Sequence, residues 1–312
     1  MEGKKRLATL VGCNYPNTIN ELHGCINDVK AMHHLLIARF GFHPDEITLL
    51  TDDPASTELP TGANIMQALG RMVSQAEPGD VLFFHYSGHG TLIPAVKPHH
   101  GRSTRDEAIV PCDFNLITDV DFRLLVDRLP AGVSFTIISD SCHSGGLIDK
   151  EKEQIGPSAN TNTTTPHRKR SIPFSTVLDH VSSLSSIDSP HIGDHLLDLF
   201  GKEASAKFSD GLISPRTIGE DDGILLSGCQ TNETSADMSP NESGGTSYGA
   251  FSNAIQVVMK EHARALSNKE LVVRTRELLH ERGFTQHPCL YCSDDNADVA
   301  FLLHKEKHEK FI

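Results

Sequence analysis

The chain has 312 residues, of which 38% are hydrophobic and 22% are charged, and its formal net charge is −13. This composition is typical of a globular protein with a sizeable core, and it excludes a disordered or fibrous chain. The negative charge argues against a nucleic-acid partner and against docking on a membrane surface, because both need a basic face.

The first residues of the chain and its cysteine content indicate in which cellular compartment the protein resides. Residues 1–6 lead straight into a short apolar run and lack the pattern of a signal peptide, and no stretch is long enough to span a bilayer. Seven cysteines, an odd number, fit a reducing environment better than a disulfide framework. We expect a cytoplasmic protein, with a nuclear pool and an unconventional extracellular pool left open.

The first half of the chain alternates β-branched runs with stretches of helical periodicity. We predict strands at residues 5–11, 46–50, 81–86, 108–111 and 133–139. A helix with an apolar face from Ile26 to Phe40 should stop at Gly41, and the next should begin near Thr61, a good N-cap. This alternation predicts an α/β fold with a mostly parallel central sheet and helices on both faces.

The second half contains a change of composition. From Gly156 to Arg170 the periodicity gives way to Pro, Ser, Asn and Thr and then to a basic run, which is typical of a linker. Residues 171–220 are ambiguous, with one helix expected around residues 194–200. The pattern then resumes, with a strand at 224–227, helices near 248–266 and 269–282, and a strand around 288–292.

Two of the predicted strands end in the same way, with small and polar residues after an apolar run. His89 follows the strand at 81–86, between Gly88 and Gly90, and Cys142 follows the strand at 133–139. If these strands are neighbours, both side chains lie at the edge where ligands bind in parallel sheets. A cysteine beside a histidine can act as a nucleophile, because imidazole accepts the thiol proton or stabilises the thiolate as an ion pair.

The main-chain N–H groups of Gly90 and Cys142 are candidates for binding an oxyanion. Taken alone, a buried cysteine is more often a core residue, and a histidine at a strand end is often only a surface residue. The two together, each flanked by glycine, favour a pair of catalytic residues.

The sequences around the two residues resemble the catalytic motifs of the metacaspases, in the caspase-like clan. They read Phe-His-Tyr-Ser-Gly-His89-Gly and Asp140-Ser-Cys142-His-Ser-Gly-Gly. Further segments resemble the type II branch of plants and its short-linker subgroup, among them Leu22-His-Gly-Cys-Ile-Asn-Asp28 and the closing His-Pro-Cys-Leu-Tyr-Cys292. The resemblance covers most of the chain and implies a cysteine endopeptidase with a caspase-like fold.

The resemblance also implies a division of the chain and a biological role. Residues 1–156 would form a large catalytic region, residues 157–220 a flexible linker, and residues 221–312 a small region that completes the same sheet. Such a protein would be made as a zymogen and would act as a monomer in plant cell death or stress proteolysis. No cofactor is expected to be required, with calcium considered below. Its partners would be protein or peptide substrates, including the chain itself.

Asp28, Ser87 and Asp140 match positions that line a specificity pocket in metacaspases. There, carboxylates accept the positive end of an arginine or lysine at P1, the residue before the cut. A carboxylate two residues before a nucleophilic cysteine would raise its pKa and hinder ionisation, which favours a role for Asp140 in substrate binding. The alternative for Asp28 is a surface acid favoured by the helix dipole.

A basic cluster, His167-Arg-Lys-Arg170, lies in the predicted linker. For a peptidase specific for arginine or lysine it would be a substrate within the same chain, so we predict autocleavage between Arg170 and Ser171. A nuclear-localisation signal is the competing interpretation and does not exclude the first.

Cys25 resembles a second metacaspase cysteine near the active site, although packing is the simpler interpretation of its role.

Calcium is where the sequence departs from the family pattern. Asp106, Glu107, Asp119 and Asp149 resemble parts of a calcium cluster, but Val120 stands where an aspartate is usual. Because calcium prefers six to eight oxygen ligands, only a weak site is expected, and we predict calcium-independent activity. The resemblance to the short-linker subgroup also implies a mildly acidic pH optimum.

Three other interpretations stay open at this point. The Cys289-Leu-Tyr-Cys292 spacing suits zinc or redox chemistry, although the two side chains would point to opposite faces of a strand. A caspase-like module that has lost catalysis could serve as an adaptor, and a different cysteine hydrolase, such as an amidase, would use the same pair of residues.

Overall fold

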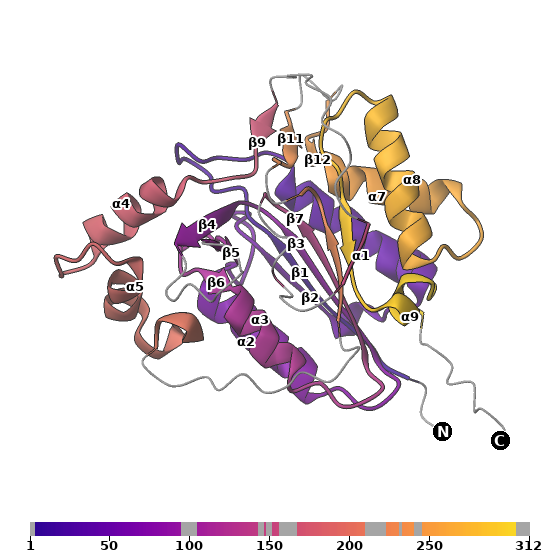
Figure 1. Cartoon of the computed structure of the whole chain (residues 1–312), viewed down its shortest axis with the longest axis horizontal. Helices are drawn as coiled ribbons and strands as arrows, with labels where there is room; N and C mark the ends of the chain where they lie inside the picture. Colours follow the sequence, from indigo (N-terminus) through magenta and orange to yellow (C-terminus); the bar gives the residue numbers. More distant parts are fainter. Residues whose placement is uncertain are drawn as a thin grey trace.

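A seven-stranded sheet forms the centre of the molecule (Figure 1). The computed structural model describes residues 4–94, 105–142, 147, 152–155, 167–209, 223–230, 233–239 and 245–303. The strand order is β2-β1-β3-β7-β10-β13-β8. The first five strands are parallel, and they span Ile47–Thr51 (β2), Arg6–Gly12 (β1), Val81–Ser87 (β3), Ser134–Asp140 (β7) and Ile224–Ser227 (β10). The last two, β13 (Cys289–Tyr291) and β8 (Glu153–Ile155), are antiparallel to their neighbours.

Helices cover both faces of this sheet. The helices α1 (Cys25–Phe40), α7 (Ala250–Glu261) and α8 (Asn268–Glu281) lie on one face, and α2 (Gly62–Ser74) and α3 (Asp119–Val126) lie on the other. Each face has its own apolar core, with Met32 and Phe251 on the first and Ile65 and Phe122 on the second. The predicted α/β architecture is confirmed.

The helix boundaries follow the local chemistry. Helix α1 is followed by Gly41 at φ 68°, the left-handed conformation that glycine adopts without strain. Helix α2 begins after Thr61, whose side chain accepts a hydrogen bond from the N–H of Asn64. Both helix boundaries were predicted from the sequence, because capping depends on residues that are close together in the chain.

One predicted strand lies outside the central sheet. The segment predicted at 108–111 is the end of β5 (Arg105–Ile109), which pairs with β4 (Gly90–Pro94) and β6 (Ile117–Thr118) in a small antiparallel sheet. Strand β4 starts immediately after His89, so the chain turns out of the main sheet at the candidate site. Periodicity alone does not distinguish such a strand from one in the main sheet.

The region predicted as a flexible linker contains helices and a strand where the structure describes it, and the helix expected around residues 194–200 is present. Residues 167–209 form β9 (Arg168–Lys169), α4 (Phe174–Leu184), α5 (Ile192–Phe200) and two short 3-10 turns, η2 (Gly201–Glu203) and η3 (Ala206–Phe208). Val177, Val181 and Leu196 are fully buried in the core of the α2–α3 face. Helix α4 was not predicted, because its many serines obscure the helical pattern of apolar residues. Its two buried residues, Val177 and Val181, are spaced four residues apart.

The remaining elements are a strand pair and two short turns of helix. β11 (Ala236–Met238) lies between β12 (Tyr248–Gly249) and β9 in a second three-stranded sheet. η1 (Pro44–Glu46) precedes β2, and α9 (Asp294–Ala297) follows β13. Across the ranges described above, no helix combines the length and apolar character needed to cross a bilayer.

Candidate active site

The two strands that precede His89 and Cys142 are direct neighbours. β3 and β7 pair in parallel from Val81 opposite Ser134 to Ser87 opposite Asp140, so their carboxyl ends lie side by side. His89 and Cys142 each follow two residues beyond their strand, and they are only 3% and 0% exposed. The sheet therefore brings the predicted pair to one edge, as the sequence required.

The His89 ring is fixed in one tautomer by a backbone carbonyl. Its Nε2 lies 2.7 Å from the carbonyl oxygen of Asn20. Because a carbonyl only accepts hydrogen bonds, Nε2 carries the proton and Nδ1 carries the lone pair. Nδ1 is buried and has no hydrogen-bond partner among the described residues. Burial lowers the pKa of His89 to about 4, against the opposing effect of the Asn20 carbonyl, so the ring is a neutral base.

Two tyrosine hydroxyls hold the backbone of His89. The Tyr15 hydroxyl accepts a hydrogen bond from the N–H of His89 at 3.0 Å, and the Tyr86 hydroxyl donates one to its carbonyl at 2.8 Å. Tyr15 has a φ of 51°, and the Asp52 carboxylate stabilises this left-handed conformation by accepting its N–H. These contacts place the imidazole without taking part in its chemistry.

The backbone around Cys142 binds the carbonyl of Arg170. The N–H groups of Cys142 and Gly90 donate to this oxygen at 3.0 and 3.1 Å, which is the geometry of an oxyanion hole. The Cys142 Sγ accepts a hydrogen bond from the N–H of Ser235 at 3.1 Å. Gly90 is required here, because a Cβ on it would lie 1.8 Å from the Cys142 carbonyl oxygen.

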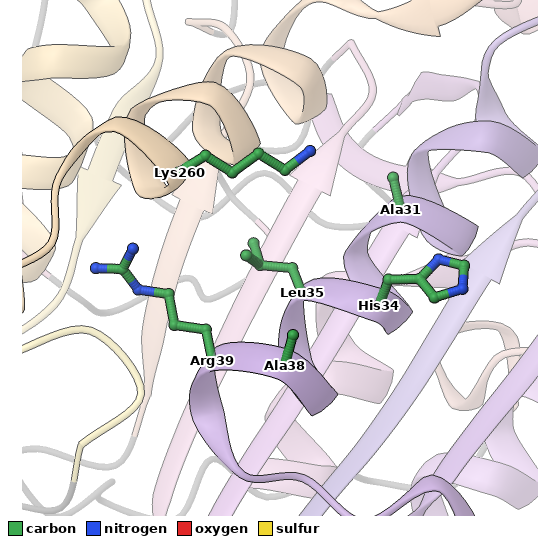
Figure 2. A pocket seen from close by; sticks show the side chains of 6 residues that line it. All are labelled: Ala31, His34, Leu35, Ala38, Arg39 and Lys260. Atoms are coloured by element: carbon green, nitrogen blue, oxygen red, sulfur yellow. The ribbon is translucent and has the colours of Figure 1, made fainter.

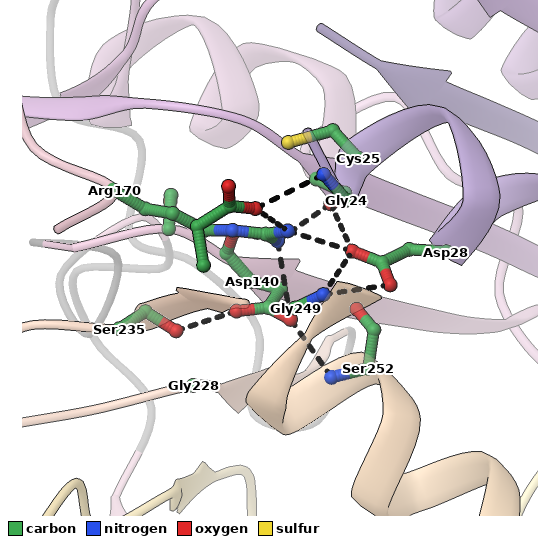
Figure 3. Close-up of polar contacts among 12 residues, drawn as sticks. Gly24, Cys25, Asp28, Asp140, Arg170, Gly228, Ser235, Gly249 and Ser252 are labelled. Carbon is green, nitrogen blue, oxygen red and sulfur yellow. Dashed lines mark hydrogen bonds and ion pairs between the residues drawn. The ribbon is translucent and has the colours of Figure 1, made fainter. Parts of the chain in front are cut away.

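The side chain of Arg170 is completely buried among three carboxylates, which we call the acidic site: Asp28, Asp140 and Asp237. Figure 3 shows Arg170 with Asp28 and Asp140. Its Nη2 lies 2.8 Å from Asp28 and 2.9 Å from Asp237, and its Nη1 lies 3.2 Å from Asp140. The Ser87 hydroxyl accepts from Nη1 at 2.6 Å and donates to Asp28 at 2.7 Å. The three residues predicted from the family motif therefore meet at one guanidinium.

The acidic site holds three carboxylates for one guanidinium. Burial raises the pKa of the Asp28 carboxyl from its ordinary value of 3.8 to about 7, although Arg170 opposes this shift. Ser87 and the N–H of Gly249 also stabilise the charged form. The site thus takes up a proton more readily than a surface aspartate does.

This proton uptake predicts a pH dependence of stability. Because the folded protein binds the Asp28 proton more tightly than the unfolded chain, the free energy of unfolding should fall as the pH rises from about 4 to about 7. Above that range the carboxyl is ionised in both states, and the effect levels off. We expect a Cys142→Ala protein to follow this course in a series of Tm measurements, and Asp28→Asn in the same background to flatten it.

The control for this series is Asp45→Asn, which changes a carboxylate on an exposed side chain. It should leave the slope of Tm against pH unchanged. Equal slopes with and without Asp28→Asn would contradict the assignment of the proton to Asp28.

The chain on both sides of Arg170 is held in an extended form. On one side, β9 pairs antiparallel with β11, and the N–H of Arg170 donates to the Ser235 carbonyl at 3.0 Å. On the other side, the N–H of Ile172 donates to the Gly90 carbonyl at 3.1 Å. Main-chain pairing of this kind, together with a site for one side chain, is how an extended peptide is recognised at a sheet edge.

The second cysteine expected near the site is Cys25, at the start of α1. It lies beside the acidic site (Figure 3), and burial raises the pKa of its thiol well above the ordinary value. A thiol that stays protonated is a poor nucleophile, so the packing interpretation fits it better. Cys289 and Cys292 are also buried, and no group of three His, Cys, Asp or Glu in the described ranges is arranged to hold a metal ion.

Two of the residues predicted as a weak calcium site, Asp106 and Asp119, already have cationic partners. Lys207 Nζ lies 2.7 Å from Asp106 and 3.1 Å from Asp119, and Arg123 lies 3.2 Å from Asp119. Asp149 lies outside the described residues. A calcium ion at these two carboxylates would have to compete with the cations of the chain itself.

A depression further along α1 has a different character. It lies between α1 and α7 (Figure 2) and is lined by Ala31, His34, Leu35, Ala38, Arg39 and Lys260. Arg39 donates hydrogen bonds to the carbonyls of Met259 and His262, at the end of α7. This guanidinium therefore caps a helix, and the lining has no nucleophile.

Sequence reasoning missed several residues of the site. Asp237 completes the acidic site from β11, and its carboxylate also accepts the N–H groups of His23 and Gly24. Asp237 lies ten residues beyond the end of β10. It therefore does not directly follow an apolar run, which was the pattern that identified His89 and Cys142. Asn20 acts through its backbone carbonyl, which any residue carries, so its identity holds no signal. Ser235 contributes its backbone and also its hydroxyl, which donates a hydrogen bond to Asp140 (Figure 3), but it too lies far from the strand ends in the sequence.

Comparisons with known proteins agree with this geometry. Residues 5–299 match the family model described as Caspase domain. The chain is 59% identical to Metacaspase-9 of Arabidopsis thaliana, over 96% of this chain and 97% of that protein, and 38% identical to Metacaspase-6, over 95% and 99%. A crystal structure of a Geobacter sulfurreducens protein has the same fold, with a TM-score of 0.64 at 20% identity over 97% of this chain and 100% of that one.

The fold and the site define a cysteine peptidase with a caspase domain. Within that class, the chain belongs to the metacaspase family. Of the interpretations left open by the sequence, the family supports the peptidase rather than a silent adaptor or an amidase.

Proposed function

We propose that this cysteine peptidase cleaves after arginine or lysine and that its first substrate is its own chain at Arg170. The observation that supports this is the position of Arg170, whose guanidinium lies in the acidic site while its carbonyl oxygen accepts the N–H groups of Gly90 and Cys142. A P1 residue of a substrate needs both contacts at once.

The contacts of Arg170 also suggest why lysine would be accepted. Both terminal nitrogens of its side chain bind partners, and Nε has no partner within the described residues. A site that recognises only the far end of the side chain also suits an ammonium group, which donates three hydrogen bonds. Three carboxylates exclude an aspartate at the same place by repulsion.

The proposed reaction uses the two side chains at the carboxyl edge of the sheet and the two N–H groups that bind the Arg170 carbonyl oxygen. His89 Nδ1 takes the proton of the Cys142 thiol, and the sulfur attacks the carbonyl carbon of the P1 residue. The N–H groups of Gly90 and Cys142 stabilise the oxyanion. When the C–N bond breaks, the imidazolium gives its proton to the leaving nitrogen, and a thioester remains. Water, deprotonated by His89, then releases the acid and restores the thiol.

In the precursor this same arrangement blocks the site. The extended segment around Arg170 covers the acidic site, and Cys142 is completely buried. We therefore propose a zymogen that is cut after Arg170 into a piece of residues 1–170 and a piece that begins at Ser171. The roles in cell death or stress proteolysis, the monomeric state and the cytoplasmic location stay predictions.

Intact mass spectrometry tests the self-cleavage. Purified precursor should convert to the two pieces on incubation, whereas Cys142→Ala protein should stay intact. Arg170→Gln removes the charge that the acidic site binds, and it should prevent this cut in a protein that is otherwise active.

Arg170→Lys is the matched control, because it keeps the positive charge and should still be processed. Cleavage of Cys142→Ala protein at Arg170, or equal processing of Arg170→Gln, would contradict the proposal.

A further inference from the structure

A lysine from the second half of the linker region fills the space between two carboxylates of the catalytic region. Lys207, in η3, places its Nζ 2.7 Å from Asp106 of β5 and 3.1 Å from Asp119 of α3. Its side chain is only 9% exposed, and those of the two aspartates are 24% and 11% exposed. Ion pairs this well covered are screened less than surface pairs, so they couple the elements that carry them.

The residues next to Lys207 are attached to the same place. The N–H of Ala206 donates to Asp121 at 3.0 Å, and the hydroxyls of Ser205 and Thr118 lie 2.9 Å apart. Asp121 also accepts the N–H of Thr118 in the capping box of α3. Three consecutive residues of the linker region therefore bind the start of one helix, where the backbone dipole favours negative side chains.

The carboxylates at this place are all occupied by protein groups. Asp119 contacts both Lys207 and Arg123, and Asp121 is committed to Thr118 and Ala206. Burial raises the pKa of Asp119, and Lys207 opposes that shift by favouring the charged form. A divalent cation would have to displace an ammonium group that the chain already holds within ion-pair distance.

We propose that Lys207 is an internal cation that takes the place of a divalent ion between Asp106 and Asp119. In that position it joins η3, and with it the α4–α5 segment, to β5 and α3 without metal. The place where the sequence suggested a weak calcium site is thus filled by one of the side chains of the chain itself. This inference concerns binding and stability, and it holds whether or not Arg170 is the processing site.

The test is to remove the ammonium group and offer calcium in its place. In a Cys142→Ala background, Lys207→Gln should have a lower Tm than the parent in chelator. Millimolar calcium should raise the Tm of Lys207→Gln by at least about 2 °C, because a ligand that binds only the folded state stabilises it. The parent should have the same Tm with calcium and with chelator, and terbium luminescence should appear only in the variant.

Three variants serve as controls. Lys207→Arg keeps a cation and should not respond to calcium. Lys152→Gln removes a lysine that pairs with Asp294 on the surface, and it should not respond either. Adding Asp119→Asn to Lys207→Gln should remove the calcium response, because one of the two carboxylates is gone.

Several results would overturn the proposal. One is calcium or terbium binding by the parent protein that Asp119→Asn abolishes. Another is a Lys207→Gln protein whose Tm equals that of the parent and ignores calcium. If Lys207→Gln does not fold in either condition, Asp106→Asn decides: a lowered Tm supports the ion-pair link, and an unchanged Tm overturns it.

Discussion

Replacing Cys142 or His89 by alanine is expected to lower kcat/KM on a peptide ending in arginine by roughly 10,000-fold or more. Without the sulfur there is no acceptor for the acyl group, and without the imidazole no base removes the thiol proton. The neutral state of His89, with its pKa lowered to about 4 by burial, makes the ring an acceptor throughout the neutral range. Release of a fluorescent group from the peptide measures the loss.

The control for this loss is Cys25→Ala. Cys25 lies near the same edge of the sheet, but burial raises the pKa of its thiol, which keeps it protonated. We expect this variant to retain most of the activity. A large loss of kcat/KM in Cys25→Ala together with a small loss in Cys142→Ala would show that Cys25 is the nucleophile. That result would contradict the assignment of Cys142.

Replacing Asp140 by asparagine is expected to lower kcat/KM for arginine peptides by roughly 100- to 1,000-fold, because it removes one partner from a completely buried ion pair. Asp140 binds the guanidinium at 3.2 Å and also accepts the N–H of Ser252 at 2.8 Å. The amide keeps the shape of the side chain but not its charge. Peptides that end in arginine, lysine or aspartate, measured side by side, report the change in preference.

Asp80→Asn provides a matched control. Asp80 is also buried, and it accepts the N–H groups of Lys5 and Glu77, but it lies just before β3, at the other end of the strand from His89. Its replacement should lower stability without altering the preference for arginine. If Asp140→Asn kept full activity on arginine while its Tm stayed unchanged, the acidic site would not be the P1 site.

The parts of the fold that could be predicted from the sequence are those set by residues that are neighbours in the chain. The strands that end before His89 and Cys142 were found because their apolar runs stop abruptly at small and polar residues. The end of α1 and the start of α2 were found from single residues with strong conformational preferences. The three predicted residues of the acidic site came from the family motif, and the structure brings them to one guanidinium.

The parts that were missed depend on contacts between distant segments. Asp237 reaches Arg170 only because β11 crosses the carboxyl edge of the sheet, and nothing near it in the sequence indicates this. Helix α4 has a polar composition, and its stability comes from burying Val177 and Val181 against the body of the protein. The role of Lys207 depends on a contact with Asp106, one hundred and one positions earlier in the chain.

The segment that carries Arg170 is tied down on both sides, by pairing with β11 before it and by the burial of Ile172 after it. Under the proposed cleavage, enzyme and substrate would be parts of one molecule that are already held together, and no encounter in solution would have to precede the first cut. Activation by the proposed cleavage is then a unimolecular reaction. Its half-life should not depend on the concentration of the protein in the cell.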